Sequence, residues 1–145
     1  MGGTYKFVDE LDAVTTTNYI PMDQIDIFDV AQLYNSSANR TGWYTQTASG
    51  SVPPERTDSC IWYAAAPDNS SFNIYIYAGA QLYGTFYNDV YVLSLPSFTW
   101  SQVYGTTNGS RFGHTCHRVS PRQVITVGGA ETWNFNGVSG YIMPF

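Results

Sequence analysis

The chain has 145 residues, of which 12% are charged and 17% aromatic, and its formal net charge is −5. This composition excludes disorder and differs from that of helical proteins rich in Ala, Glu, Lys and Leu. The 6 basic residues provide no patch to neutralise phosphates, so a nucleic-acid partner is not expected. No apolar run reaches the about 18 residues of a spanning helix, so membrane attachment is expected only through segments outside this chain.

Eight short strands are predicted from apolar runs that Gly, Pro, Asn and Asp interrupt. In chain order they cover residues 25–30, 43–47, 59–65, 73–78, 89–95, 99–104, 115–119 and 123–128. Nothing in the sequence suggests a helix, so the predicted fold class is all-β. A β-sandwich is the alternative to the architecture argued below.

The predicted strand 89–95 is apolar on both faces. Tyr91 and Leu93 point to one side, and Val90 and Val92 to the other. A strand in a simple two-layer sheet has one wet side, so a different packing is needed. In a propeller each four-stranded blade packs face to face between two others, which keeps its middle strands dry on both sides.

Three segments recur along the chain. Residues 74–80 match 124–130, residues 54–60 match 109–116, and residues 25–47 match 88–103. This alignment places Arg56 opposite Arg111, Cys60 opposite Cys116, and Trp43 opposite Trp100. The internal period is roughly 50 residues, which is typical of a propeller repeat.

The order of these features resembles the kelch repeat. Arginine, Gly-His, an apolar strand, Gly-Gly, an Asn-Asp-Val-Tyr strand and tryptophan follow one another, and residues 111–129 are the most family-like segment. The resemblance covers most of residues 25–130 and is nearest to fungal cell-surface and galactose-oxidase-like kelch proteins. It implies a kelch-type β-propeller fragment built of four-stranded antiparallel blades. Gly79-Ala80 stands where the double glycine is expected.

Residues 1–145 are interpreted as a single partial propeller of about two and a half repeats. Residues 1–47 hold the end of one blade with a long loop, 48–107 a complete blade, and 108–145 the start of a third. The unpaired blade faces at the two ends allow self-association.

Six positions are predicted to be structural: Gly79, Asp89, Gly128, Gly129, Trp43 and Trp100. The glycines let strand ends take positive φ where strands crowd. The aspartate accepts backbone N–H bonds where its strand begins. The two tryptophans are expected to be wedges between adjacent blades.

Four N-glycosylation sequons begin at Asn35, Asn39, Asn69 and Asn108. All four lie in predicted loops, where glycans can be attached. They indicate a secreted or cell-surface glycoprotein, with a cytosolic propeller as the alternative.

The two cysteines leave alternatives open. A disulfide between Cys60 and Cys116 would join equivalent strands of adjacent blades. Equivalent positions on inner strands can exceed the Cα separation of about 7 Å that a disulfide tolerates. Two buried free thiols, or partners outside this chain, are therefore at least as well supported by the sequence.

No catalytic, metal or cofactor site is predicted. His114 and His117 are three apart, which on a strand puts them on opposite faces and prevents them from sharing a metal. No Gly-x-Ser-x-Gly, P-loop or dinucleotide motif occurs. The alternative is a fragment of a galactose-oxidase-like copper-radical oxidase whose metal ligands lie outside this chain.

One face of the propeller is predicted to bind a protein or a carbohydrate. The connections from second to third strands and from blade to blade open on that face. They gather the loop residues Tyr83, Phe86 and Tyr87 near Arg56 and Arg111, a set suited to stacking and charge-assisted hydrogen bonds. The alternative is that both arginines only tie neighbouring blades by bonding backbone carbonyls. Binding through this face is also what the kelch resemblance implies.

Overall fold

The computed structural model describes residues 4–7, 16–34, 42–81, 84–106 and 109–131. The described strands are β1 (Thr4–Phe7), β2 (Thr16–Tyr19), β3 (Gln24–Phe28), β4 (Trp43–Thr47), β5 (Ser49–Gly50), β6 (Cys60–Ala65), β7 (Phe72–Ala80), β8 (Phe86–Leu95), β9 (Thr99–Gly105), β10 (Arg111–Ser120) and β11 (Gln123–Glu131). A short 3-10 helix, η1, spans Val30–Tyr34. The all-β prediction is confirmed, and each of the eight predicted strands has a counterpart.

The predicted strand 25–30 ends earlier than expected. Asp29 stops it, because its carboxylate accepts a hydrogen bond from the backbone N–H of Ala31 at 3.0 Å and from the Gln32 side chain at 3.1 Å. Such local bonding to an aspartate favours a turn over strand continuation. Val30 therefore lies in η1.

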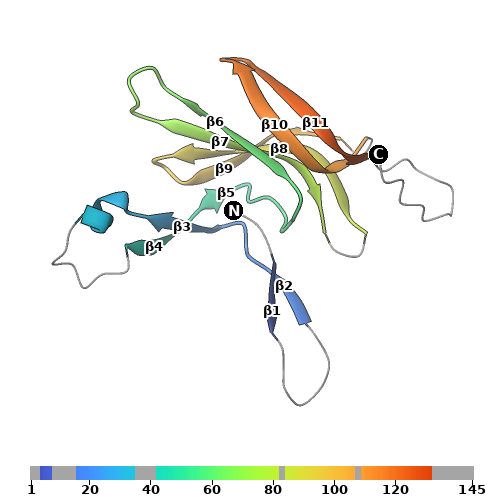
Figure 1. The fold of residues 1–145 in the computed structure, drawn as a ribbon, viewed down its shortest axis with the longest axis horizontal. Helices are drawn as coiled ribbons and strands as arrows, with labels where there is room; N and C mark the ends of the chain where they lie inside the picture. Colours follow the sequence, from blue (N-terminus) through green and yellow to red (C-terminus); the bar gives the residue numbers. More distant parts are fainter. Residues whose placement is uncertain (1–3, 8–15, 35–41, 82–83, 107–108, 132–145) are drawn as a thin grey trace, which may run out of the picture.

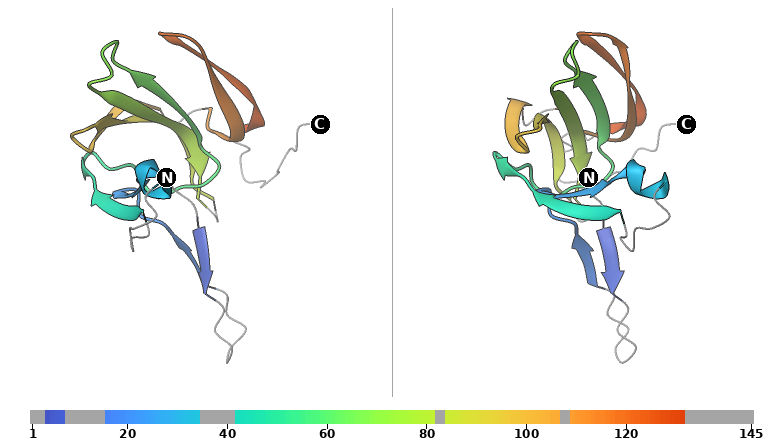
Figure 2. Two further views of the ribbon diagram at one scale, coloured as in Figure 1. Left: turned by 60° about the vertical axis from the view of Figure 1, so that its left-hand side comes forward. Right: turned by 90° about the vertical axis from the view of Figure 1, so that its left-hand side faces the viewer.

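The largest sheet is one four-stranded antiparallel blade with a short addition. Its strand order is β5-β9-β8-β7-β6, and β5 joins the outer edge by a two-residue parallel pairing with β9. The β10–β11 hairpin lies against β6, β7 and β8 (Figure 1). The β1–β2 hairpin projects away from the other strands (Figure 2). Within the described residues the chain forms one whole blade and two-stranded portions of its neighbours.

The core lies between this blade and the segment containing β3. Its buried members are Met22, Ile25, Ala48, Ile76, Tyr91, Leu93 and Trp100. The Trp100 indole N–H donates to the backbone carbonyl of Met22 at 3.0 Å, which satisfies the one polar atom of the indole. On β8, Leu93 is fully buried and Val92 is 8% exposed. Buried side chains thus lie on both faces of this strand, as the propeller packing requires.

The two tryptophans are not equivalent in packing. Trp100 is 1% exposed and is the expected wedge, whereas Trp43 is 61% exposed. The Trp43 ring contacts Phe28 on the neighbouring strand at a centroid distance of 5.0 Å. The expectation of a second wedge is therefore not met at Trp43, because no described element covers that face of the β3–β4 hairpin.

The double-glycine position is shifted by one residue from the sequence alignment. Ala78 and Gly79 have φ of 57° and 101°, and Gly128 and Gly129 have φ of 71° and 81°. Ala78-Gly79 is thus the counterpart of Gly128-Gly129, and the assignment to Gly79-Ala80 is corrected. A Cβ on Gly79 would lie 2.6 Å from the carbonyl oxygen of Thr57, so the second position has no room for a side chain.

Candidate functional site

Arg56 lies in the segment before β6, and polar groups and an aromatic ring enclose its guanidinium. Its guanidinium forms a two-pronged ion pair with Asp89, with a second contact of 3.1 Å between Nη2 and Oδ2. It also donates to the carbonyls of Pro54 at 3.0 Å and Ala78 at 3.1 Å. The ring of Tyr87 covers it at 4.0 Å from the guanidinium carbon. Since Arg56 is 1% exposed, this geometry favours the structural alternative over ligand contact.

Arg111 repeats this arrangement in the next blade, but in a more open form. Its Nη1 donates to the carbonyl of Gly128 at 3.1 Å, as Arg56 does to the equivalent residue, Ala78. Glu131 supplies the carboxylate that pairs with it. The Arg111 side chain is 28% exposed, so it remains accessible to a partner.

The aromatic residues predicted to bind are placed differently from one another. Phe86 packs on Phe112 at 5.1 Å between ring centroids, which joins β8 to the next blade. Tyr87 is half-buried against Arg56, and burial raises the pKa of its phenol, an effect that the guanidinium opposes. Tyr83 lies outside the described residues. Phe86, Phe112 and Arg111 therefore lie at one end of β8 and β10, and we call this the loop face.

The structure describes one of the four asparagines predicted to be glycosylated. Asn69 lies in the exposed turn between β6 and β7, and its backbone N–H donates to the carbonyl of Ala66 at 2.9 Å. The side chain is open to solvent, as glycan attachment requires. Asn35, Asn39 and Asn108 lie outside the described residues.

Cys60 and Cys116 form a disulfide with a Cα separation of 5.5 Å, which decides among the alternatives that the sequence left open. The strand register explains why the two cysteines meet. Cys60 pairs with Tyr77. The residue equivalent to Tyr77 in the next repeat is Val127, and Val127 pairs with Thr115. Thr115 is thus the counterpart of Cys60. Because successive residues of a strand point to opposite faces, the one-residue offset turns Cys116 back toward Cys60.

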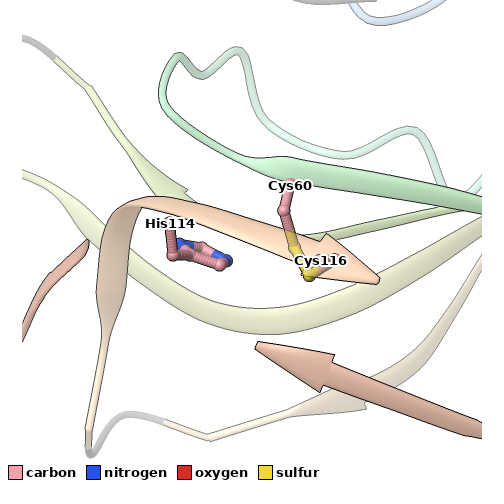
Figure 3. A group of neighbouring side chains, drawn as sticks. All are labelled: Cys60, His114 and Cys116. Carbon is pink, nitrogen blue, oxygen red and sulfur yellow. A yellow bond between two sulfur atoms is a disulfide. The ribbon is translucent and has the colours of Figure 1, made fainter. Parts of the chain in front are cut away.

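His114 completes a cluster with this disulfide. It lies two residues before Cys116 on β10, and the donor atoms of Cys60, His114 and Cys116 all lie within 4.8 Å of one another (Figure 3). His114 is 5% exposed, and neither ring nitrogen has a hydrogen-bond partner among the described residues. The ring meets Tyr77 edge-on at 5.1 Å. Burial, followed by the charge of Arg111, lowers the pKa of the imidazole.

This cluster was not predicted from the sequence, although a signal was present. The two histidines of the chain, His114 and His117, are three apart, and His117 is exposed. The informative spacing is His114-x-Cys116, because residues two apart on a strand share a face. The third member, Cys60, comes from the neighbouring repeat, so its approach depends on how the blades stack.

A cleft runs beside this cluster, between β6 and β10. It is lined by Ile61, Trp62 and Tyr63 on one side and by residues 116–121 on the other. Arg118 crosses it, and its Nη1 donates to the carbonyl of Tyr63 at 3.2 Å. Cys116 is half-buried and borders the cleft, so the disulfide is within reach of small molecules from solvent.

A complete four-stranded blade, a two-stranded part of the next blade packed against it, and a repeated arginine together define a segment of a β-propeller. In each repeat the arginine donates to the carbonyl of the first residue of the positive-φ pair, Ala78-Gly79 or Gly128-Gly129. No family model matches the chain. A "Kelch repeat-containing protein" of Arthroderma benhamiae is 36% identical over 124 residues, which is 79% of this chain and 17% of that relative. The chain is a kelch-type β-propeller segment.

The relative is much longer than the aligned region, and the chain spans about a sixth of its length. Among the described residues, none forms a helix long and apolar enough to cross a membrane.

Proposed function

We propose that the chain is a non-catalytic binding module of a secreted or cell-surface kelch protein, and that it binds another protein through the loop face. The carrying observation is the partly exposed Arg111 side chain, next in sequence to the Phe112 ring that packs on Phe86 of the neighbouring blade. Arginine and aromatic residues are enriched at the centres of protein interfaces. The backbone N–H of Gly113 donates to the carbonyl of Asp58 at 2.9 Å, so the two blades are bonded to each other at this face.

A carbohydrate ligand is less well supported. Sugars stack on open aromatic faces, and the Tyr87 ring is already occupied by the Arg56 guanidinium. The Phe86 and Phe112 rings are tilted by 38° and pack on each other. These contacts leave less flat aromatic surface than the loop sequence suggests.

Two observations support a secreted or cell-surface location. Cys60 and Cys116 form a disulfide, and such bonds persist in oxidising compartments. Asn69, the one sequon residue that the structure describes, lies in an exposed turn. Protein made in its native host is expected to gain mobility on a gel after enzymatic deglycosylation. If deglycosylation leaves the gel mobility unchanged, the result would favour the cytosolic alternative.

A galactose-oxidase-like copper site would need a cysteine linked to a tyrosine. Both cysteines of this chain are bonded to each other, and His114 and His117 face opposite sides of β10. These contacts support a non-catalytic role. Copper content and alcohol oxidation, measured on the longest natural protein that contains the chain, are expected to be at background.

Photo-crosslinking tests the binding face. A photoreactive phenylalanine analogue replaces Phe112 in protein expressed by its native host, and the control carries it in place of Val103, which is 55% exposed on β9. We expect a discrete protein adduct from the first variant alone. Adducts of equal yield from both positions, or none from either, would contradict the proposal.

A further inference from the structure

We propose that Cys60, His114 and Cys116 form a redox-gated zinc site, which the disulfide closes and reduction opens. Two thiolates and one imidazole are ligands that Zn²⁺ prefers. Their donor atoms lie within 4.8 Å of one another (Figure 3). Around a tetrahedral zinc ion, bond lengths of about 2.0–2.3 Å place the donors roughly 3.5–3.8 Å apart. The donor atoms therefore already lie close to the separations that zinc requires, and cutting the S–S bond lets the two sulfur atoms move apart to reach them.

His114 is the independent indication that this cluster takes a ligand. Buried polar atoms in proteins nearly always have a hydrogen-bond partner. Both ring nitrogens of His114 are buried and lack one among the described residues, and the ring lies beside the two sulfur atoms. A zinc–nitrogen bond would supply a partner to one of them.

A glycine on the neighbouring strand allows the backbone to pass close to His114. Gly129 has φ of 81°, and a Cβ there would lie 2.8 Å from the Cβ of His114 and 2.6 Å from the carbonyl oxygen of Phe112. The glycine thus lets β11 approach β10 closely at this point. Tyr77 holds the imidazole ring from the other blade by an edge-on contact.

Charge balance favours zinc over a monovalent soft metal. Two thiolates, a neutral imidazole and Zn²⁺ sum to zero, whereas Cu⁺ in the same site would leave one negative charge. Buried net charge is unfavourable because of lost hydration. The fourth coordination position would be filled by water or another small ligand, as in open zinc sites.

The disulfide and the zinc-bound form interconvert through the reduced dithiol. Two molecules of a thiol reductant cleave the Cys60–Cys116 bond, giving two cysteine thiols and the oxidised reductant disulfide. Zn²⁺ then binds with release of two thiol protons and accepts a lone pair from His114. The cleft beside Cys116 provides access for both reagents. At the proposed secreted or cell-surface location the pair remains a disulfide, and the site takes the metal only where a thiol reductant cleaves that bond.

Cobalt provides the spectroscopic test. The chain is reduced anaerobically with a phosphine, freed of reductant and titrated with Co²⁺ and then Zn²⁺. We expect thiolate-to-cobalt charge-transfer absorption that saturates at one equivalent and is abolished by zinc, and no such absorption from the oxidised chain. If the reduced apoprotein unfolds, zinc is expected to restore its circular dichroism spectrum, because metal binding and folding are coupled.

His114→Asn distinguishes a zinc site that includes His114 from metal binding by the two thiols alone. This variant keeps both cysteines, and its oxidised form provides a check on folding. Its reduced form is expected to bind zinc at least about 10-fold more weakly than the wild type, in a chelator competition. His117→Asn, an exposed neighbour on the same strand, is the matched control and is expected to bind as the wild type does. Undiminished binding by His114→Asn, or a reduced chain that neither binds nor refolds with metal, would overturn the proposal.

Discussion

Arg56 and Asp89 form a buried ion pair that joins the segment entering β6 to the middle strand β8. Their side chains are 0% and 11% exposed. The same guanidinium donates to the carbonyl of Ala78 at the end of β7. One side chain thus connects three parts of a blade at the point where its strands converge.

Removing the carboxylate is expected to destabilise the blade strongly. Asp89→Ala leaves a buried guanidinium unpaired, which costs about 3–5 kcal/mol of unfolding free energy. Arg111→Ala breaks the more exposed pair with Glu131 and is expected to cost about 1 kcal/mol or less. Urea denaturation measures both. The double variant Arg56→Met with Asp89→Leu is expected to be more stable than Asp89→Ala, and equal losses for Asp89→Ala and Arg111→Ala would contradict the buried pair.

The two tryptophans are predicted to differ in their contribution to stability. Trp100→Ala opens a large cavity and leaves the Met22 carbonyl without its donor, so it is expected to cost about 3–5 kcal/mol. Trp43→Ala removes an exposed ring and is expected to cost about 1 kcal/mol or less. Chemical denaturation followed by circular dichroism distinguishes them. A larger loss for Trp43→Ala would show that its face is covered in solution.

Glycines at the first and second positions of the two positive-φ pairs are predicted to respond differently to alanine. At Gly128, with φ of 71°, a Cβ meets nothing within 4 Å, so Gly128→Ala is expected to cost only the left-handed strain of about 1–2 kcal/mol. At Gly79 the same change adds a clash with the Thr57 carbonyl at 2.6 Å. Gly79→Ala is therefore expected to lower the thermal midpoint clearly more. Equal shifts would mean that the blade relaxes to accept the methyl group.

Stability is predicted to fall at alkaline pH through the tyrosines around Arg56. Burial raises the pKa of Tyr87, an effect that Arg56 opposes and Asp89 assists. Burial, with Asp89, also raises the pKa of Tyr91. A raised folded-state pKa contributes stability that is complete below the ordinary value of about 10 and is lost as the pH rises through the folded value. The urea midpoint is expected to decline from about pH 10 upward.

Phenylalanine variants isolate this effect. Tyr87→Phe is expected to make the alkaline decline shallower, because it removes one group that must ionise against burial. Tyr104→Phe, at a residue 54% exposed on β9, is the control and is expected to leave the decline unchanged. An identical pH profile for Tyr87→Phe and the wild type would exclude a contribution from Tyr87.

Most of the strand positions could be predicted because they follow from local patterns. Within residues 89–95, Tyr91, Leu93 and Leu95 make one face apolar and Val90 and Val92 the other, and that pattern indicated packing between two layers. The strand β5 could not be found in this way, because Ser49-Gly50 has no apolar pattern and pairs only through backbone contact with Thr99-Trp100. Asp29 ended a predicted strand through side-chain bonds that the apolar pattern does not encode.

The candidate site was only partly predictable, because equivalent residues of a repeat differ in their neighbours. The sequence by itself determined the repeat, most strand positions and the residue types: an arginine and a cysteine in each of the second and third units, and a tryptophan in each of the first and second. Tertiary structure decided that Arg56 and Trp100 are enclosed while Arg111 and Trp43 remain open. Tertiary structure also decided that Cys116 faces Cys60 beside His114, because Cys116 is one residue out of register with Cys60. Burial and side-chain direction depend on the adjacent blade, and no local sequence pattern contains that blade.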